Sequence, residues 1–540
     1  MTASPLRPDQ RLYFLDWIRI IAFLVLILYH TGMYYVTWDW HVKSPDASHA
    51  IEPLMILSAP WRLGLLFMIS GVATAFMLGK LHVGSLLAQR SWRLLVPLAF
   101  GMLVIVPPQA YFEVVEKVAY QGGYGEFLQL YITSYKGFCR GDDCLAMPTW
   151  NHLWFVAYLW VYTMLFGTLA WLAAGRLHTW SAATARVLTG WKLFVIPVVI
   201  LLAARIGLAE HFPSTHALTG DWYNHAQYFF LFVLGALLAT QRGTWAETDR
   251  LRWTSLALWL GSWAILVVCY SMPHALMHSP AVAPWRPLMS AVYCLNQWAP
   301  ILAGCGFAHH HVTGDSTARR YLTEAVFPVY ILHQTLIVTM AHWLKPIHLA
   351  PAVEGAVLVI LTLTISFGVF ELVRRVTALR PLFGLGKPRS NDYTSGTAPA
   401  IAQAVNAQLP AGAASTPLAA DADTAPASAQ TRTAPAGACA GNAPAAAQTR
   451  TPPADAWAGT APVAVAATVA AIVAVAVAVA ADAGADAGAD SDADADVDSD
   501  ADAGGAPWLP PPVARSGGAA AMAGSASTVP SVATPASTCA

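Results

Sequence analysis

Residues 15–30 read Leu-Asp-Trp-Ile-Arg-Ile-Ile-Ala-Phe-Leu-Val-Leu-Ile-Leu-Tyr-His, and this stretch shows best what kind of fold the chain has. It is almost continuously apolar, and a membrane span needs about 20 mostly apolar residues. Ten runs of this kind follow one another along the chain. They lie at about 13–36, 54–79, 93–112, 150–173, 190–209, 226–241, 252–271, 286–307, 321–343 and 352–377. The sequence therefore predicts an all-α polytopic membrane protein with about ten transmembrane helices.

The composition excludes several classes of protein. The chain has 540 residues, of which 56% are hydrophobic and only 11% are charged. A soluble globular protein carries about 25% charged residues, so a soluble enzyme over the whole length is excluded. The formal net charge is −1 and there is no basic stripe, so we expect no nucleic-acid partner. The expected surroundings are a lipid bilayer.

The chain divides into two parts of different composition. Residues 1–389 contain 27 of the 30 Lys and Arg and have a net charge of +9, whereas residues 390–540 have a net charge of −10. We predict a membrane domain over 1–389 and an Ala/Pro/Asp-rich low-complexity tail over 390–540, which we expect to be disordered. The uncharged Ala/Val run 461–481 leaves an eleventh span as an alternative. The nine Asp between 482 and 502 are typical of a solvated acidic segment, and no metal site is expected.

The basic residues predict the orientation. Alternate ends of the predicted spans carry 18 and 7 Lys and Arg. By the positive-inside rule, the N-terminus and the end of the membrane domain face the cytoplasm, as in a multi-pass protein of the inner membrane. Cys139 and Cys144 then lie in an outer loop, where they could form a disulfide if that compartment is oxidising.

The first span contains ionisable residues, which are costly in a bilayer and therefore candidates for function. Arg19 and His30 are eleven residues apart. This spacing is close to three helical turns, so both lie on one helix face, about 16 Å apart. Asp16 lies three residues before Arg19 and can neutralise it. The alternative is a structural ion pair and a buried core histidine.

Other polar residues lie near the ends of later spans or within them. Arg90 and Arg93 form a cationic pair suited to phosphate, although positive-inside topology also explains them. Ser70-Gly71 would let two helices approach closely. The remaining candidates are His152 and Trp154 at the start of the fourth span, and Tyr330 and His333 in the ninth.

In their order along the chain, these residues resemble the acyltransferase 3 family of membrane acyltransferases. The resemblance covers about residues 10–385. Within the family, the chain looks most like the glucan-biosynthesis branch, whose members modify periplasmic glucans. One position departs from the family pattern, because many members have glycine where this chain has Ile20. The motifs that carry the resemblance are Arg19-x10-His30, Arg90-x-x-Arg93, Phe67–Gly71, His152–Phe155 and Phe327–Gln334.

The resemblance implies transfer of an acetyl or succinyl group from cytoplasmic acyl-CoA to a hydroxyl of an envelope carbohydrate. No permanently bound cofactor is implied, since acyl-CoA is a substrate. Arg19, Arg90 and Arg93 would bind the donor. His30 would be the general base, with Asp16 orienting Arg19. The acceptor end would be shaped by His152, Trp154, Tyr330 and His333.

Two alternatives remain open from the sequence. His30 could act as a nucleophile that carries the acyl group covalently. The protein could instead be a membrane transporter or a non-catalytic carbohydrate-binding membrane protein, because intramembrane His and Arg also serve substrate pathways. A repeated pair of broken helices would favour a transporter, and the sequence shows none.

Overall fold

The computed structural model describes residues 12–140, 143–173, 175–273, 279–312 and 314–386. These residues are mainly helical, as predicted. The predicted tail and the run 461–481 lie outside the described residues. The longer helices are α1 (Tyr13–Tyr35), α2 (Glu52–Ser58), α3 (Arg62–Leu78), α4 (Val83–Phe100), α5 (Val106–Val118), α6 (Tyr124–Ile132), α7 (Trp154–Leu172), α8 (Leu177–Val187), α9 (Lys192–Leu208), α10 (Trp222–Leu238), α11 (Arg242–Arg250), α12 (Arg252–Tyr270), α14 (Arg286–His311), α15 (Thr317–Leu344) and α16 (Pro351–Arg375).

Short elements complete the described fold. A π-helical segment, Gly101–Ile105, joins α4 to α5. Strands β1 (Cys139–Arg140) and β2 (Asp143–Cys144) pair in antiparallel orientation, and a disulfide joins Cys139 to Cys144. The 3₁₀ turns are His49–Ile51, Asn151–Leu153, Ala283–Trp285, Lys345–Ile347 and Pro381–Phe383.

All ten predicted spans lie in helices, but fewer qualify as spans on their own. Seven of the described helices are long and apolar enough to cross a membrane, or nine if each of two bent pairs counts as one span. The bent pairs are α8 with α9, at 109°, and α10 with α11, at 111°. The chain is therefore a multi-pass membrane protein.

Helix α14 has the length of a span but carries polar residues in its interior. Asn296 donates a hydrogen bond to Ser262 of α12 at 2.9 Å, and Gln297 donates one to Gln227 of α10 at 2.7 Å. Both side chains are buried between helices, where a polar group needs a partner. The lower hydropathy of α14 thus reflects contacts with other helices.

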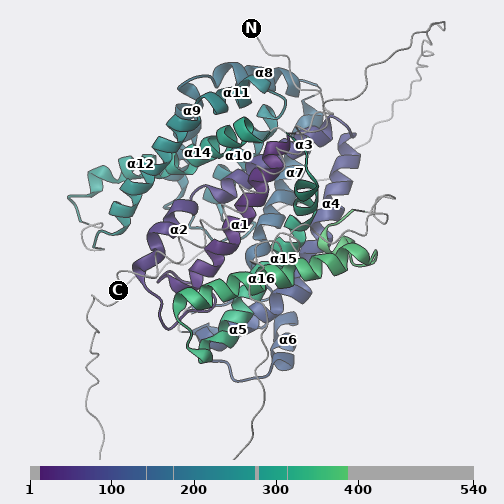
Figure 1. The fold of residues 1–540 in the computed structure, drawn as a ribbon, viewed down its shortest axis with the longest axis vertical. Coiled ribbons are helices and arrows are strands. Elements are labelled where there is room, and N and C mark those ends of the chain that lie inside the picture. The colour runs from purple at the N-terminus through teal and green to yellow at the C-terminus, as the bar shows by residue number, and fades with distance from the viewer. Residues whose placement is uncertain (1–11, 141–142, 174, 274–278, 313, 387–540) are drawn as a thin grey trace, which may run out of the picture. The chain divides into compact units, whose positions relative to one another are not determined.

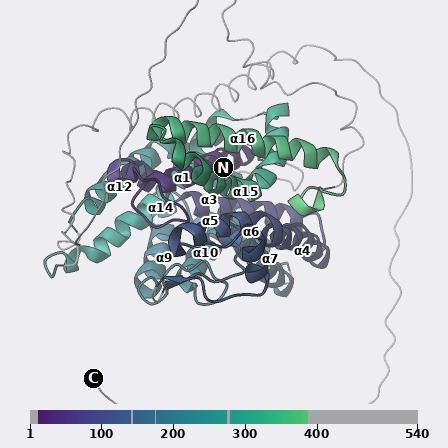
Figure 2. The same ribbon diagram turned by 90° about the horizontal axis from the view of Figure 1, so that it is seen from below.

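Helix α1 packs against several other helices. It contacts α15, α14, α3 and α16. Figure 1 shows it in purple beside α3 and α15, and Figure 2 shows α1 and α15 next to α16 in the turned view. Buried residues such as Trp17, Ile20 and Leu26 pack α1 against this surround.

Two glycines bring α3 and α10 into close contact. A Cβ at Gly71 would lie 1.9 Å from the carbonyl oxygen of Phe232, and a Cβ at Gly235 would lie 2.1 Å from that of Met68. Each glycine thus faces the backbone of the other helix, as small residues do in membrane helix pairs. Across the same pair of helices, Phe67 of α3 stacks on Tyr228 of α10 with ring centroids 4.9 Å apart.

Candidate active site

Three histidines from distant parts of the chain meet in one cluster. His30 comes from α1, His333 from α15 and His152 from the 3₁₀ turn before α7. His30 Nδ1 and His333 Nε2 are 2.9 Å apart, and the two rings stack with centroids 5.0 Å apart. The ring of His152 meets that of His333 edge-on at 5.2 Å. The structure thus brings together three of the predicted site residues.

The hydrogen-bond network assigns the protons on the His30–His333 pair. The carbonyl oxygen of Tyr330 can only accept, so His333 Nδ1, 2.6 Å away, must carry a hydrogen. In the neutral ring His333 Nε2 then accepts from His30 Nδ1. This arrangement leaves the lone pair on His30 Nε2, a nitrogen without a hydrogen-bond partner among the described residues. His30 is only partly buried, whereas His333 is fully buried.

His152 and Tyr330 bind each other's backbone. His152 Nε2 donates to the carbonyl oxygen of Ile331 at 3.0 Å, and the Tyr330 hydroxyl donates to the carbonyl oxygen of His152. The opposite nitrogen of His152, Nδ1, is buried without a hydrogen-bond partner in the described chain. These bonds fix the start of α7 against the middle of α15, beside His333.

Trp154 lies in a neighbouring aromatic group. Its ring stacks on His216 with centroids 4.3 Å apart and meets Tyr158 edge-on at 5.0 Å. Phe67 of α3 lies 6.4 Å from it and connects this group to the interior of the bundle. The predicted role of Trp154 in substrate binding therefore concerns this group rather than the histidine cluster.

Among the described residues, Asp16 at the start of α1 pairs with two arginines. Its Oδ1 accepts a hydrogen bond from Arg19 Nη2 at 3.5 Å, and its Oδ2 accepts one from Arg319 of α15. Arg319 is 1% exposed and also donates to Asp315 at 2.8 Å. Burial raises the pKa of Asp315, but the hydrogen bond from Arg319 and the positive charges of Arg319 and Arg320 together lower it by more, so the pKa of this carboxyl stays below its usual range. Asp16 thus joins α1 to α15.

Arg90 and Arg93 lie on α4. Arg90 is close enough to Arg93 and to Arg19 of α1 to interact electrostatically with both guanidinium groups. Arg93 donates to the carbonyl oxygen of Gly384 at 3.2 and 3.3 Å, and Arg90 donates to Thr74 at 3.4 Å. Neither arginine forms a salt bridge with a carboxylate in the described part of the chain. Their positive charge is therefore available to an anionic ligand.

The pattern of the family described as "Acyltransferase domain" matches residues 12–371. The chain belongs to the acyltransferase 3 family. The match covers His30, His152 and His333, and it also covers Arg19, Arg90 and Arg93. It indicates an acyltransferase. No curated protein matches the chain, and no solved structure does.

A second histidine site, which the sequence did not predict, borders the acyltransferase's histidine cluster. His41 follows α1 and lies 2.6 Å from Glu113 of α5, to which its Nδ1 donates. Its Nε2 lies 2.9 and 2.8 Å from the amide nitrogens of Gln109 and Gln334, which share its single lone pair as hydrogen-bond donors. Gln334 is the residue after His333, so α15 presents one side chain to each site. Single polar residues in three separate segments gave no pattern that could reveal this network.

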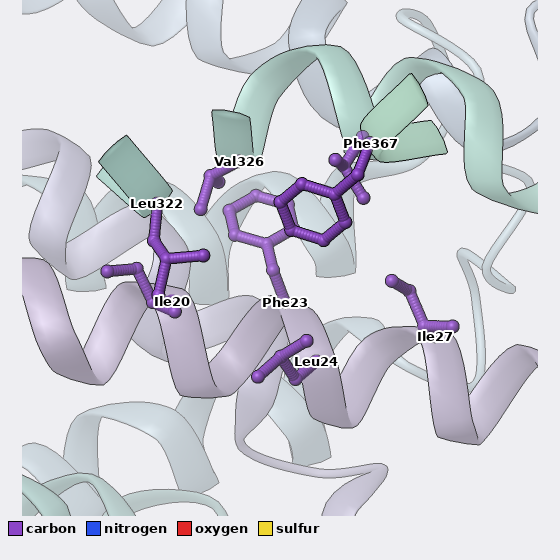
Figure 3. Close-up of a pocket in the computed structure, with 8 residues that line it drawn as sticks. Ile20, Phe23, Leu24, Ile27, Leu322, Val326 and Phe367 are labelled. Carbon is purple, nitrogen blue, oxygen red and sulfur yellow. The ribbon is translucent and has the colours of Figure 1, made fainter. Parts of the chain in front are cut away.

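An apolar pocket flanks α1 between Arg19 and His30 (Figure 3). It lies between α1, α15 and α16 and is partly open to the surroundings. Phe23 extends from α1 toward Phe367 and Val326, and its ring packs edge-on against Tyr330 at 5.5 Å. The pocket lining has no charged side chain, so it suits hydrocarbon. Its lining residues are Ile20, Phe23, Leu24, Ile27, Leu322, Val326, Val329 and Phe367.

Proposed function

We propose that this membrane acyltransferase moves an acetyl or succinyl group from cytoplasmic acyl-CoA to a hydroxyl of an envelope carbohydrate, such as a glucan. The observation that carries the proposal is the His30–His333 hydrogen bond, which directs the lone pair of His30 to Nε2. Family membership supports the reaction class. The arginines at the other end of α1 support a phosphate-bearing donor.

The donor end of the proposed site is cationic. Guanidinium groups form paired hydrogen bonds to phosphate oxygens, and coenzyme A carries several phosphates. Arg90 and Arg93 would bind them, and Arg19 would bind the donor deeper in the bundle. In the orientation predicted from the positive-inside rule, Arg19, Arg90 and Arg93 lie toward the cytoplasmic side of the inner membrane. His30 lies toward the opposite side, where the carbohydrate would be presented.

The chemical step begins with proton transfer to His30. The acceptor hydroxyl gives its proton to Nε2 while its oxygen attacks the thioester carbonyl carbon. The tetrahedral intermediate then releases the sulfur of coenzyme A, which leaves as a thiol after taking the proton from His30. His333 stabilises the positive charge that appears on His30, because its Nε2 accepts a hydrogen bond from His30 Nδ1–H before and after the proton transfer to Nε2 of His30.

The same nitrogen could act instead as a nucleophile. His30 Nε2 would then attack the thioester, release coenzyme A and pass the acyl group to the acceptor. Incubation of purified protein with labelled acyl-CoA and no acceptor separates the two routes. A label that stays on the denatured protein of the wild type but not of His30→Ala would favour the covalent route.

The test of the proposed function is transfer of label from acyl-CoA to a glucan by the purified chain. Replacing His30 with alanine should lower the rate by about 10²- to 10⁴-fold, as expected for loss of a general base. His342→Ala is the matched control, since His342 of α15 is partly buried like His30 but pairs with Glu116. Equal rates in wild type and His30→Ala would refute the assignment.

A further inference from the structure

Arg62 is a buried cation that the proposed mechanism does not use. It is the first residue of α3, within a candidate membrane span, and it is 4% exposed. Its Nε and Nη1 are buried without a hydrogen-bond partner among the residues that the structure describes, and no described carboxylate forms a salt bridge with it. Its Cζ lies 3.3 Å from the centre of the Tyr29 ring. A buried charge with so little compensation is expensive.

The chain compensates its other buried arginines. Of the described arginines, three are buried, and the other two each have a carboxylate partner. Arg319 pairs with Asp16 and Asp315, and Arg380 pairs with Glu324 at 3.0 Å. Arg62 is thus the exception, and an anion from outside the chain would supply what the fold does not.

The surroundings of Arg62 favour an anion. The span His49–Leu78 is interrupted between α2 and α3, and Arg62 opens the second helix, where the free N–H groups and the helix dipole are positive. Arg205 of α9 has its Cζ 3.9 Å from the centre of the Tyr293 ring. Tyr293 also lies within electrostatic range of Arg62, so both guanidinium groups are in the neighbourhood of the same tyrosine. Arg205 forms no salt bridge with a described carboxylate either.

This cationic group adjoins the histidine cluster. The Tyr29 ring, which covers the Arg62 guanidinium, lies 5.9 Å from the ring of His30. Arg62 is also near enough to interact electrostatically with His30 itself. An anion bound at Arg62 would therefore lie close enough to His30 for one molecule to reach both.

We propose that Arg62, the first turn of α3 and Arg205 form an anion-binding subsite beside His30. The subsite binds an oxyanion, either the terminal carboxylate of a dicarboxylic acyl group or a phosphate carried by the acceptor. Only the identity of the carrier rests on the proposed acyl transfer. Anion binding itself can be measured without turnover, so the two proposals can fail separately.

The test measures thermal unfolding of the purified full chain in an uncharged detergent. Succinate and inorganic phosphate are added separately, each against sodium chloride at equal ionic strength. We expect one of the two anions to raise the unfolding temperature of the wild type by about 2–4 °C. The shift should vanish in Arg62→Gln and persist in part in Arg62→Lys. Arg286→Gln should behave like wild type, because Arg286 also opens a helix but is exposed.

The anion that protects identifies the source. Protection by succinate assigns the subsite to the acyl group, and protection by phosphate assigns it to the acceptor. Phosphate bound at Arg90 and Arg93 would protect Arg62→Gln equally. Equal protection of wild type and Arg62→Gln, or no protection of the wild type by either anion, would overturn the proposal.

A second measurement separates binding from a structural role. Without added anion, Arg62→Gln should unfold at the same temperature as wild type or higher, because the substitution removes an uncompensated buried charge. An unfolding temperature several degrees below that of wild type would show that Arg62 stabilises the fold, and the subsite would be rejected.

Discussion

The identity of His30 follows from the sequence, but the nitrogen that acts does not. Its position eleven residues after Arg19 is visible in the primary structure. The proton positions depend on His333 and on the carbonyl oxygen of Tyr330, which lie some 300 residues further along the chain. A neutral imidazole has one donor and one acceptor nitrogen, so this distant carbonyl determines which nitrogen of His30 is basic.

Replacing His333 should therefore impair catalysis without displacing His30. We expect His333→Ala to lower kcat by about 10- to 100-fold, in the range found when a partner that orients an essential histidine is lost. The KM for acyl-CoA should change little, because the donor phosphates lie at the other end of α1. His333→Gln keeps an acceptor for His30 Nδ1 and should restore part of the rate. Equal kcat in wild type and His333→Ala would show that the bond does not position His30.

Asp16 shows how a local pattern can miss a distant partner. The sequence predicts Arg19 as its partner because the two are three residues apart, and the structure shows this contact at 3.5 Å. Arg319, which is buried at 1% exposure, also pairs with Asp16. No local pattern could predict a contact between residues 303 positions apart. The orienting role of Asp16 toward Arg19 stays a prediction.

Removing the Asp16 charge should destabilise the fold. In Asp16→Asn the buried Arg319 loses one of its two carboxylate partners and keeps Asp315, so the cost should stay below the value of about 3–5 kcal/mol for breaking an isolated buried pair. Thermal unfolding in detergent should show a clear decrease. Asp315→Asn should have a smaller effect, since the Asp315 side chain is 34% exposed. Equal unfolding temperatures for Asp16→Asn and wild type would contradict a stabilising pair.

At the scale of the helices, hydropathy predicted the elements well and their bends poorly. All ten predicted spans are helical because apolar runs of about 20 residues in a bilayer must satisfy their backbone internally. The bends of 109° and 111° arise between helices separated by only a few polar or turn-forming residues. Such short breaks change hydropathy little, so the sequence could not reveal them.

The contact between α3 and α10 should tolerate no added methyl group. In Gly71→Ala the new Cβ would lie 1.9 Å from the Phe232 carbonyl oxygen, so one helix must shift. Overpacking of this kind costs about 1–3 kcal/mol. We expect a lower unfolding temperature for Gly71→Ala but not for Gly261→Ala, because nothing lies within 4 Å of a Cβ at Gly261 in α12. The close approach would be wrong if both variants behaved alike.

The arginine pair of α4 should affect donor use rather than folding. We expect Arg90→Gln with Arg93→Gln to raise the KM for acyl-CoA by about 10-fold or more, because each hydrogen bond to a charged group contributes about 1.5–3 kcal/mol. Arg320→Gln is the control, since Arg320 is an exposed arginine of α15 near Asp315. A double variant that misorients in the membrane, instead of binding the donor weakly, would favour the topological interpretation.

At the scale of the whole molecule, orientation is a prediction that labelling can test. The background for labelling is a variant in which Cys439 and Cys539 are replaced by serine. The three free cysteines among the described residues are buried, so they should not react with the reagent. An impermeant thiol reagent added to intact cells should then label Glu210→Cys, at the end of α9 beyond Arg205, but not Arg320→Cys. Lysis should make Arg320→Cys reactive. The reverse result would place the arginine end outside the cytoplasm.

Sequence reasoning recovered the helices and named the polar residues near both ends of α1 and all three histidines that meet in the cluster. It succeeded where a residue stands out from an apolar run, as His30 and His333 do. It failed for His41, whose contacts depend on Glu113 of a distant helix. It also failed for Arg62, which is distinguished by the lack of a carboxylate partner among the described residues. Such partners are set by the packing of helices rather than by local spacing.

Asp16 and Arg319 tie α1 to α15 at one end, and His30 and His333 tie the same two helices near the other. Two attachments so far apart should resist sliding and tilting of α1 against α15. We therefore expect an opening that admits a substrate to come from the helices around this pair, while α1 and α15 keep their relative position.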